Sequence, residues 1–309
     1  MVFHIFPRDE VHYKWDKSLE PVIRVSPEDT VVYELREVSD GQITPASTHE
    51  VIEEIDWNRV YPLSGPVYVE GAEVGDALQV EILDIHPRGW GWSAIIPGFG
   101  LLEDEFDEPK LKIWDLSQGD YTPFNEEVKI PLDPFCGTMG LAPPEAGERE
   151  VMPPGRHGGN MDNRHLTKGT VLLLPVWVEG GLLSIGDAHA AQGDGEVCVT
   201  GIECPMNVSL RIQVKKNAGI DAPQFTTPGP LTSKYDADGY HATMGIGPDL
   251  MEASRDAVRH MIDYISDRGG MKRWEAYILC SVVVDLKISE IVDKPNWVVT
   301  AYLPLRIFA

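Results

Sequence analysis

Short runs in which apolar and polar residues alternate dominate the first two thirds of this chain. The clearest runs cover residues 31–36, 78–83 and 208–215. Alternation with a period of two is the pattern of a strand with one buried face. The 29 Gly and 24 Pro of the chain break such runs into short pieces. The sequence therefore predicts a mainly β fold, a jelly-roll-like β-sandwich, and not a parallel α/β sheet.

The carboxy-terminal part of the chain has a different pattern. One long helix is predicted after Asp249, a suitable N-cap, and Gly269-Gly270 ends it. A short helix over 272–279 and strands over 282–290 and 297–308 are predicted to follow. These elements indicate a small α/β portion that packs on the sandwich.

A Pro-Gly-Pro segment at 228–230 is the best candidate for a linker between the two parts. We therefore predict a β-sandwich domain over residues 1–228, followed by an α/β portion over residues 229–309. The candidate metal and active site described below lies in the first of these. No internal repeat is evident in the sequence.

The balance of charges limits the classes of partner. The chain has 26 Lys and Arg against 49 Asp and Glu, a formal net charge of −23. Nucleic acids and anionic membranes are bound by basic surfaces, so neither is an expected partner. The first residues do not resemble a secretory signal, and no apolar run approaches the ~18 residues of a membrane span, so we expect a cytoplasmic protein. The four Cys lack paired spacing and are predicted to be reduced, buried thiols.

Two polar clusters flank one apolar strand in the middle of the chain. Asp187 and His189 are two positions apart, so a strand would direct both side chains to the same face. Asp194 and Glu196 are also two positions apart, with Gly193 before them and Gly195 between them. Glu203 lies at the end of a further run, 197–203, that we expect to be a strand. Imidazole nitrogen and carboxylate oxygen are the ligands of catalytic zinc sites.

Simpler interpretations of the same residues exist. An isolated Asp-x-His is most often a hydrogen-bonded turn or a satisfied core histidine. Asp194 and Glu196 could close a hairpin turn without binding anything. The clustering of carboxylates, imidazoles and glycines favours a site over these alternatives.

Three ordered motifs give the chain a resemblance to a known family. They are His157-Gly-Gly-Asn-x-Asp162, Pro175-Val-x-Val-x-Gly180 and Gly186-Asp-x-His-x-x-Gln-Gly-Asp-Gly-Glu196. Together they resemble the acetamidase/formamidase family, more closely its acetamidase-like branch. The resemblance continues through 63–76, 275–285 and 296–304, so it covers nearly the whole chain. It implies an amidase that cleaves short-chain aliphatic amides, of the acetamide or formamide type, to a carboxylate and ammonia with a metal-activated water.

The resemblance also suggests roles within the two clusters. We predict that Asp162, Asp187 and His189 bind the catalytic metal, zinc, and that Glu203 is the general base. Three further residues are predicted to orient the substrate or the oxyanion: His157, Asn160 and Gln192. Asp194 and Glu196 are predicted either to hold a second, calcium-like ion or to brace the loop. No nucleophile elbow or helper for a catalytic Cys is evident.

Two other functions would fit the same pattern. A non-catalytic β-sandwich could use the acidic turn to hold a structural cation or a sugar, although two histidines among the carboxylates favour an enzyme. A family member could also have moved to a larger amide.

The segment 87–124 is rich in aromatic residues and glycine, and we expect a loop that covers the pocket or forms a subunit contact. Trp90–Phe106 in particular should lie at the mouth of the site or at a contact between subunits. A homo-oligomer, a dimer or higher, follows as an expectation.

Overall fold

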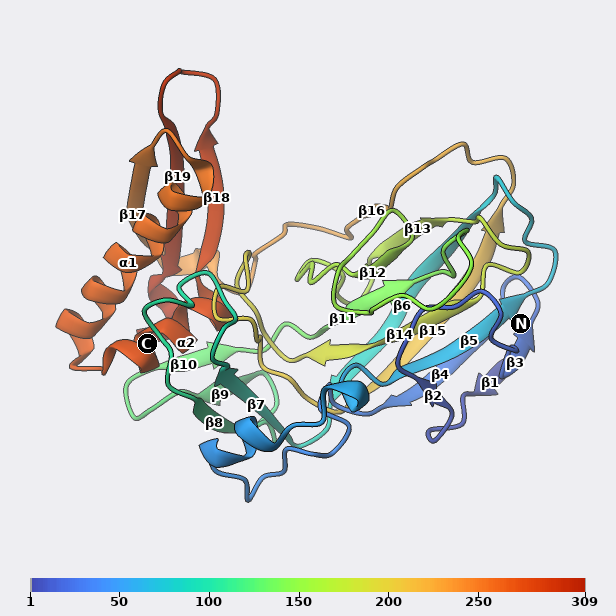
Figure 1. The fold of residues 1–309 in the computed structure, drawn as a ribbon, viewed down its shortest axis with the longest axis horizontal. Helices are drawn as coiled ribbons and strands as arrows, with labels where there is room; N and C mark the ends of the chain where they lie inside the picture. The colour runs from blue at the N-terminus through green and yellow to red at the C-terminus, as the bar shows by residue number, and fades with distance from the viewer. Residues whose placement is uncertain (1, 309) are drawn as a thin grey trace.

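The computed structural model describes residues 2–308, and its largest part is a sandwich of two six-stranded sheets (Figure 1). In the first sheet the strand order is β1 (Phe3–Ile5), β4 (Thr30–Leu35), β15 (Met206–Lys215), β6 (Ala77–Pro87), β13 (Val171–Pro175) and β16 (Gln224–Thr226). In the second the order is β12 (Gly158–Asn160), β11 (Phe135–Gly140), β14 (Leu183–His189), β5 (Leu63–Val69) and β2 (Val11–His12), with β3 (Ile23–Val25) beside β5.

Alternating side chains join the two sheets in one hydrophobic core. From the first sheet, Val31 and Tyr33 of β4 and Leu210 of β15 are at most 1% exposed. From the second, Leu183 and Ile185 of β14 are fully buried in the same cluster. The period-two pattern of the sequence therefore marks the inner faces of a sandwich. The predicted mainly β class is confirmed.

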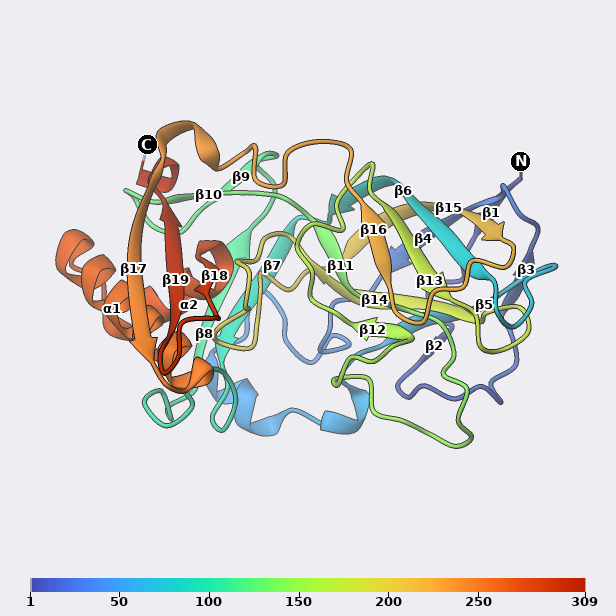
Figure 2. The same cartoon turned by 90° about the horizontal axis from the view of Figure 1, so that it is seen from above.

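The chain ends in a small α/β part that lies at one end of the sandwich (Figure 2). Its sheet has the order β17 (Tyr240–Gly247), β19 (Trp297–Pro304), β18 (Asp285–Glu290), and it carries α1 (Leu250–Gly269) and α2 (Arg273–Val283). Asp249 caps α1 by accepting from the amide of Glu252 at 2.9 Å, and Gly270 ends it in the left-handed conformation. Both predicted helix ends are confirmed.

Other predicted boundaries were wrong. The second helix continues to Val283, because its residues 276–283 are all buried where it packs against α1, β7 and β19. The strand expected from residue 282 therefore begins at Asp285, and the strand expected to reach residue 308 ends at Pro304 and continues as η4 (Leu305–Phe308). The predicted linker at 228–230 lies between β16 and the short η3 (Asp236–Asp238).

The segment expected to be a loop over 87–124 instead contains strands. They are β7 (Trp90–Ile95), β8 (Lys110–Asp115) and β9 (Tyr121–Pro123), the last pairing with β10 (Lys129–Pro131). Trp92 and Ile95 are 3% and 1% exposed, because this hairpin fills space between the sandwich and the α/β part. The apolar residues of the segment are thus covered by their own chain, which removes the reason for placing a subunit contact here.

The C-terminal part also holds the loop that carries several candidate residues. The amide of Gly193 donates to the carbonyl oxygen of Ser281 at 2.8 Å, and that of Leu286 donates to the carbonyl of Asp194 at 2.9 Å. Arg164 and Asp285, both nearly fully buried, form an ion pair at 2.5 Å. The loop is therefore fixed between two regions that are far apart in sequence. None of the described helices is both long and apolar enough to cross a membrane.

Candidate active site

The imidazole of His189 lies at the centre of a buried acidic cluster. Its Nε2 is 2.9 Å from Glu203 Oε2, 3.3 Å from Asp187 Oδ1 and 3.9 Å from Glu196 Oε1. Asp187 and His189 come from the end of β14, as the alternation predicted. Their exposed fractions are 3% and 1%, so the cluster is almost entirely removed from water.

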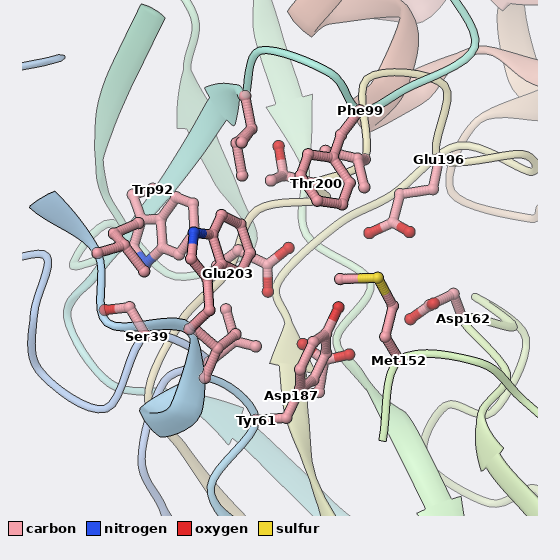
Figure 3. Close-up of a pocket in the computed structure, with 16 residues that line it drawn as sticks. Ser39, Tyr61, Trp92, Phe99, Met152, Asp162, Asp187, Glu196, Thr200 and Glu203 are labelled. Atoms are coloured by element: carbon pink, nitrogen blue, oxygen red, sulfur yellow. The ribbon is translucent and has the colours of Figure 1, made fainter. Parts of the chain in front are cut away.

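The potential ligand atoms form two overlapping groups. One contains Asp187, His189 and Glu203, and the other contains Asp162, His189 and Glu196; within each group the atoms lie within 4.8 Å of one another. Figure 3 shows the four carboxylates directed toward one pocket. The sequence named all five of these residues as candidates, and the fold brings them together.

Gly137 on β11 makes this convergence possible. A Cβ at this position would lie 2.4 Å from Asp162 Oδ1 and 2.8 Å from Asp187 Oδ2. Both distances are below van der Waals contact, so any side chain here would displace the two carboxylates. The sequence analysis did not single out this glycine, because nothing in its local pattern distinguishes it from a strand glycine.

Hydrogen bonds fix the orientation of the imidazole. Gln192 donates from Nε2 to the carbonyl oxygen of Asp162 at 2.8 Å, so its Oε1 faces His189 Nδ1, at 2.7 Å. A proton on Nδ1 is thereby favoured, which leaves Nε2 to face the carboxylates as a ligand. The carboxylate of Glu203 is also held, since its Oε1 accepts from the amide of Gly201 at 3.0 Å.

The electrostatics of the cluster are unfavourable to four negative charges. Burial and the nearby Asp187 raise the pKa of Asp162 to about 7, and burial raises the pKa of Glu203 to about 8 although His189 opposes this shift. Burial and Asp162 raise the pKa of Glu196 well above its usual range. Burial alone would lower the pKa of His189, but Glu203 and Asp187 raise it well above its ordinary value. At neutral pH the cluster therefore either keeps protons on some of these carboxylates or binds a cation that offsets their charge.

Incompletely paired atoms lie in the same cluster. Asp162 Oδ1, His189 Nε2 and Glu203 Oε2 are buried and make no well-formed hydrogen bond among the described residues, although the last two are 2.9 Å apart. Buried polar atoms are normally paired, and exceptions call for an explanation such as an ion. His189 belongs to both ligand groups, Asp162 to one and Glu203 to the other, so the residues of either group fit a divalent cation.

Backbone strain is concentrated around the same pocket. Nine residues other than glycine have a positive φ among those described, and five of them line this pocket: Tyr61, Asp162, Asp187, Glu196 and Val199. The left-handed conformation is costly for a residue with a Cβ, above all for the β-branched Val199. Such outliers cluster at functional sites, where the surrounding structure holds them in place.

Above the carboxylates the pocket has an apolar wall. It is built by segments that are distant in sequence, including Trp57 of η2 (Trp57–Arg59), Tyr61, Trp92 of β7, Ile96 and Phe99. The sequence predicted that the segment 90–106 lies at the site, and Trp92, Ile96 and Phe99 do line it (Figure 3). Tyr61 and Trp57 were not predicted, because a single aromatic residue outside any motif gives no signal.

Three predicted residues lie away from the acidic cluster or behind it. The ring of His157 stacks edge-on against Trp15, with centroids 5.0 Å apart. Asn160 accepts from Thr138 Oγ1 at 2.7 Å and donates to the carbonyl oxygen of Met152, a residue of the pocket. Asp194 Oδ2 is 3.5 Å from His165 Nε2, and Asp194 belongs to neither ligand group.

The predicted strand over 197–203 was also wrong. This segment consists of turns and bends, and only Glu203 forms bridges, to Trp92 and to His189. The positive φ of Val199 interrupts the extended backbone in the middle of this segment. The irregular path nevertheless brings Glu203 beside His189.

Comparison with known proteins identifies the family. The acetamidase/formamidase family model matches residues 6–146 and 144–309, nearly the whole chain. This chain belongs to the acetamidase/formamidase family. The predicted resemblance is thus confirmed, and with it the predicted class of enzyme, an amidase.

Several named relatives match this chain over nearly its whole length. The formamidase of Methylophilus methylotrophus is 30% identical, with 97% of this chain and 89% of that protein covered. A γ-lactamase from Delftia acidovorans has a TM-score of 0.90 at 28% identity, covering 98% of this chain and 90% of that one. An acetamidase from Bacillus halodurans has a TM-score of 0.70 at 33% identity, covering 99% and 98%.

Proposed function

We propose that this amidase is a metal-dependent hydrolase that cleaves short-chain aliphatic amides to a carboxylate and ammonia. The observation that carries the proposal is the buried ligand group of Asp187, His189 and Glu203, whose two carboxylates line a pocket. The family relatives named formamidase and acetamidase support the type of substrate. A non-catalytic role in binding a cation or a sugar is disfavoured by this family membership.

Asp187, His189 and Glu203 are the residues we assign to the metal. They are the more buried of the two ligand groups, and one imidazole with two carboxylates suits zinc in a catalytic site. When bound, the ion would lower the pKa of a water molecule toward neutrality and polarise the amide carbonyl. This assignment differs from the sequence-based one in two ways. Glu203 moves from general base to ligand, because its carboxylate lies 2.9 Å from His189 Nε2, and it takes the place of Asp162, which belongs to the other ligand group.

Glu196 takes the role of general base in this proposal. Three carboxylates lie near His189, and the side chain of Glu196 is the most exposed of them, at 17% against 5% for Asp187 and 3% for Glu203. Glu196 therefore borders both the pocket and the imidazole. Burial, and then Asp162 beside it, raise its pKa, which makes it a stronger base than an ordinary carboxylate. Glu196 accepts the proton of the attacking water and returns it to the departing nitrogen.

Tyr61 completes the polar part of the pocket. Figure 3 shows its ring beside Asp187, where the wall of the pocket meets the carboxylates. Burial and then Asp187 raise its pKa well above the usual value, so the phenol stays protonated and can donate a hydrogen bond. We assign this donor to the substrate carbonyl oxygen, where negative charge develops.

Ammonia release from formamide, acetamide and butyramide tests the proposal. The protein should hydrolyse at least one of these amides, lose activity on treatment with a chelator, and recover it on addition of zinc. Activity that survives while the metal content falls below a tenth of an equivalent would refute metal dependence.

Two isosteric variants separate the roles of the glutamates. Glu203→Gln should lower the affinity for zinc, because it removes a charged ligand, whereas Glu196→Gln should keep zinc at the wild-type stoichiometry and lose at least ~100-fold in rate. Elemental analysis of each purified variant distinguishes the two. The reverse result, full zinc in Glu203→Gln and loss in Glu196→Gln, would restore the sequence-based assignment.

A second, calcium-like ion at Asp194 and Glu196, a homo-oligomeric state and a cytoplasmic location stay proposals. Glu196 faces the pocket while Asp194 contacts His165, so the structure gives no support to an ion shared by these two residues. Exposed apolar side chains on the edge strand β1, Phe3 and Ile5, support a subunit contact, which light scattering would test. The four cysteines are all unpaired and buried, which suits a reducing compartment.

A further inference from the structure

The helix α2 and the residue after its end carry buried polar side chains that no proposed catalytic step uses. Residues 276–283 are all buried, and most of them are apolar. Tyr277 and Ser281 interrupt this run one helical turn apart, and Asp285 follows at the start of β18. These three residues, the α2 stripe, are 1%, 0% and 2% exposed. Buried polar groups are costly without partners, and all three find partners in the loop 193–200.

Two residues of the stripe hold the part of this loop that follows the proposed general base. Ser281 Oγ accepts from the amide of Cys198 at 3.1 Å and donates to the carbonyl oxygen of Thr200 at 2.7 Å. One hydroxyl thus serves as donor and as acceptor. The hydroxyl of Tyr277 donates to the carbonyl oxygen of Val197. This part of the backbone is therefore fixed to the side of α2 that carries the stripe.

The third residue of the stripe and the end of the helix hold the part that precedes the base. Asp285 Oδ1 accepts from the amide of Asp194 at 3.1 Å, and the same oxygen pairs with Arg164. A Cβ on Gly193 would lie 2.1 Å from the carbonyl oxygen of Val284, so a glycine is needed for the loop to lie this close to the end of α2. The loop is thus attached on both sides of the proposed base.

Between these attachments the backbone of the loop is strained. Glu196 and Val199 have φ values of 43° and 74°, in the left-handed region that is costly for residues with a Cβ. The amide of Glu196 donates to the carbonyl oxygen of Gly193 at 3.2 Å, and its carbonyl accepts from the amide of Val199 at 2.8 Å. These bonds lie within the loop, so the attachments on either side keep the turn in place. Figure 3 shows the Glu196 carboxylate directed into the pocket.

We infer that Tyr277, Ser281 and Asp285 are positioning residues for the proposed general base, an inference that rests on the proposed amidase activity. All three lie outside the described lining of the pocket, so they act through the backbone of the loop and not on the substrate. A buried network whose hydrogen bonds are satisfied favours one conformation. A displacement of ~1 Å in a catalytic arrangement costs on the order of 100-fold in rate.

Removing single hydroxyl groups tests the inference with little change in volume. Ser281→Ala and Tyr277→Phe should each lower kcat for acetamide at least about tenfold while KM stays within about threefold, since neither residue lines the pocket. Zinc should stay at the wild-type stoichiometry, because the assigned ligands are unchanged.

Val282→Ala is the matched control for these variants. Val282 is as fully buried as Ser281 on the same helix, but its side chain cannot form a hydrogen bond. This variant should lose at least as much stability in urea as Ser281→Ala and keep kcat within about twofold of wild type. A kcat in Ser281→Ala as high as that of Val282→Ala would overturn the inference.

Amide hydrogen exchange provides a readout that does not depend on turnover. If wild type hydrolyses none of the amides, the proposed function fails, and the attachment of the loop is still measured. The amides of Glu196 and Val199 should exchange at least about tenfold faster in Ser281→Ala than in Val282→Ala, because the turn loses its restraint. Equal exchange in the two variants would refute the role of the stripe, whether or not the amides are hydrolysed.

Discussion

Replacing Gly137 by alanine should reduce catalysis far more than it reduces folding. The added Cβ would lie 2.4 Å from Asp162 Oδ1, 2.8 Å from Asp187 Oδ2 and 2.9 Å from the carbonyl oxygen of Asp187. Ordinary contact begins at 3.4 Å, so the Asp162 carboxylate must move by about 1 Å. A displacement of this size in a catalytic arrangement costs on the order of 100-fold in rate.

The effect on stability should be smaller, because the substituted position meets side-chain ends as well as backbone. Overpacking by one methyl group costs about 1–3 kcal/mol, which would leave the protein folded at room temperature. Urea unfolding, zinc content and kcat/KM for acetamide should be measured together. Gly229→Ala is the matched control, because a Cβ there meets nothing within 4 Å and its φ is not positive. The reasoning fails if Gly137→Ala retains a third or more of the wild-type kcat/KM.

Three further predictions concern buried groups. Arg164→Met should lower the free energy of unfolding by about 3–5 kcal/mol, because it leaves the Asp285 carboxylate buried without its partner; a loss below about 1 kcal/mol in urea unfolding would contradict this. Burial would raise the pKa of Asp76, but hydrogen bonds from Lys216 and from backbone amides hold it below the usual value. The contribution of Asp76 to stability is therefore present above pH ~4 and lost as the pH falls below that value. The difference in urea midpoint between wild type and Asp76→Asn should accordingly shrink in acid. A constant difference from pH ~3 to ~7 would be evidence against this role of Asp76. Cys198→Ser should keep at least about a tenth of the rate and iodoacetamide should not inactivate the enzyme, because burial raises the pKa of this thiol to about 11; inactivation that substrate prevents would favour a thiol nucleophile.

The acidic cluster could be predicted because its residues are local in sequence and chemically distinctive. Asp187 and His189 follow from strand alternation, and the glycine-rich motifs place Asp162 and Glu196 nearby in the chain. The local structure of the loop that leads to Glu203 could not be predicted from the sequence. The loop has positive φ values and is held by contacts with α2 and β18, which are about 90 residues away in the sequence.

The apolar wall of the pocket shows the opposite case. Trp57 and Phe99 stack across a gap of about 40 residues, and no periodicity joins them. The sequence did indicate that the aromatic segment after residue 90 borders the site. It gave the wrong local structure, because strongly apolar residues interrupted by glycine were interpreted as a covering loop. In the fold they form a strand whose backbone pairs with Glu203.

The attachment of the acidic loop to the C-terminal part has a consequence for dividing this protein. The amides of Gly193 and Leu286 join the loop to α2 and β18, and the Arg164–Asp285 pair joins the two parts again. A gene cut between β16 and β17 would therefore encode one fragment with every proposed catalytic group and a second fragment with none. The first fragment would still lack the surface that shapes its loop. Amide hydrolysis would then report the association of the two fragments, which makes this connection a natural place to build a split enzyme.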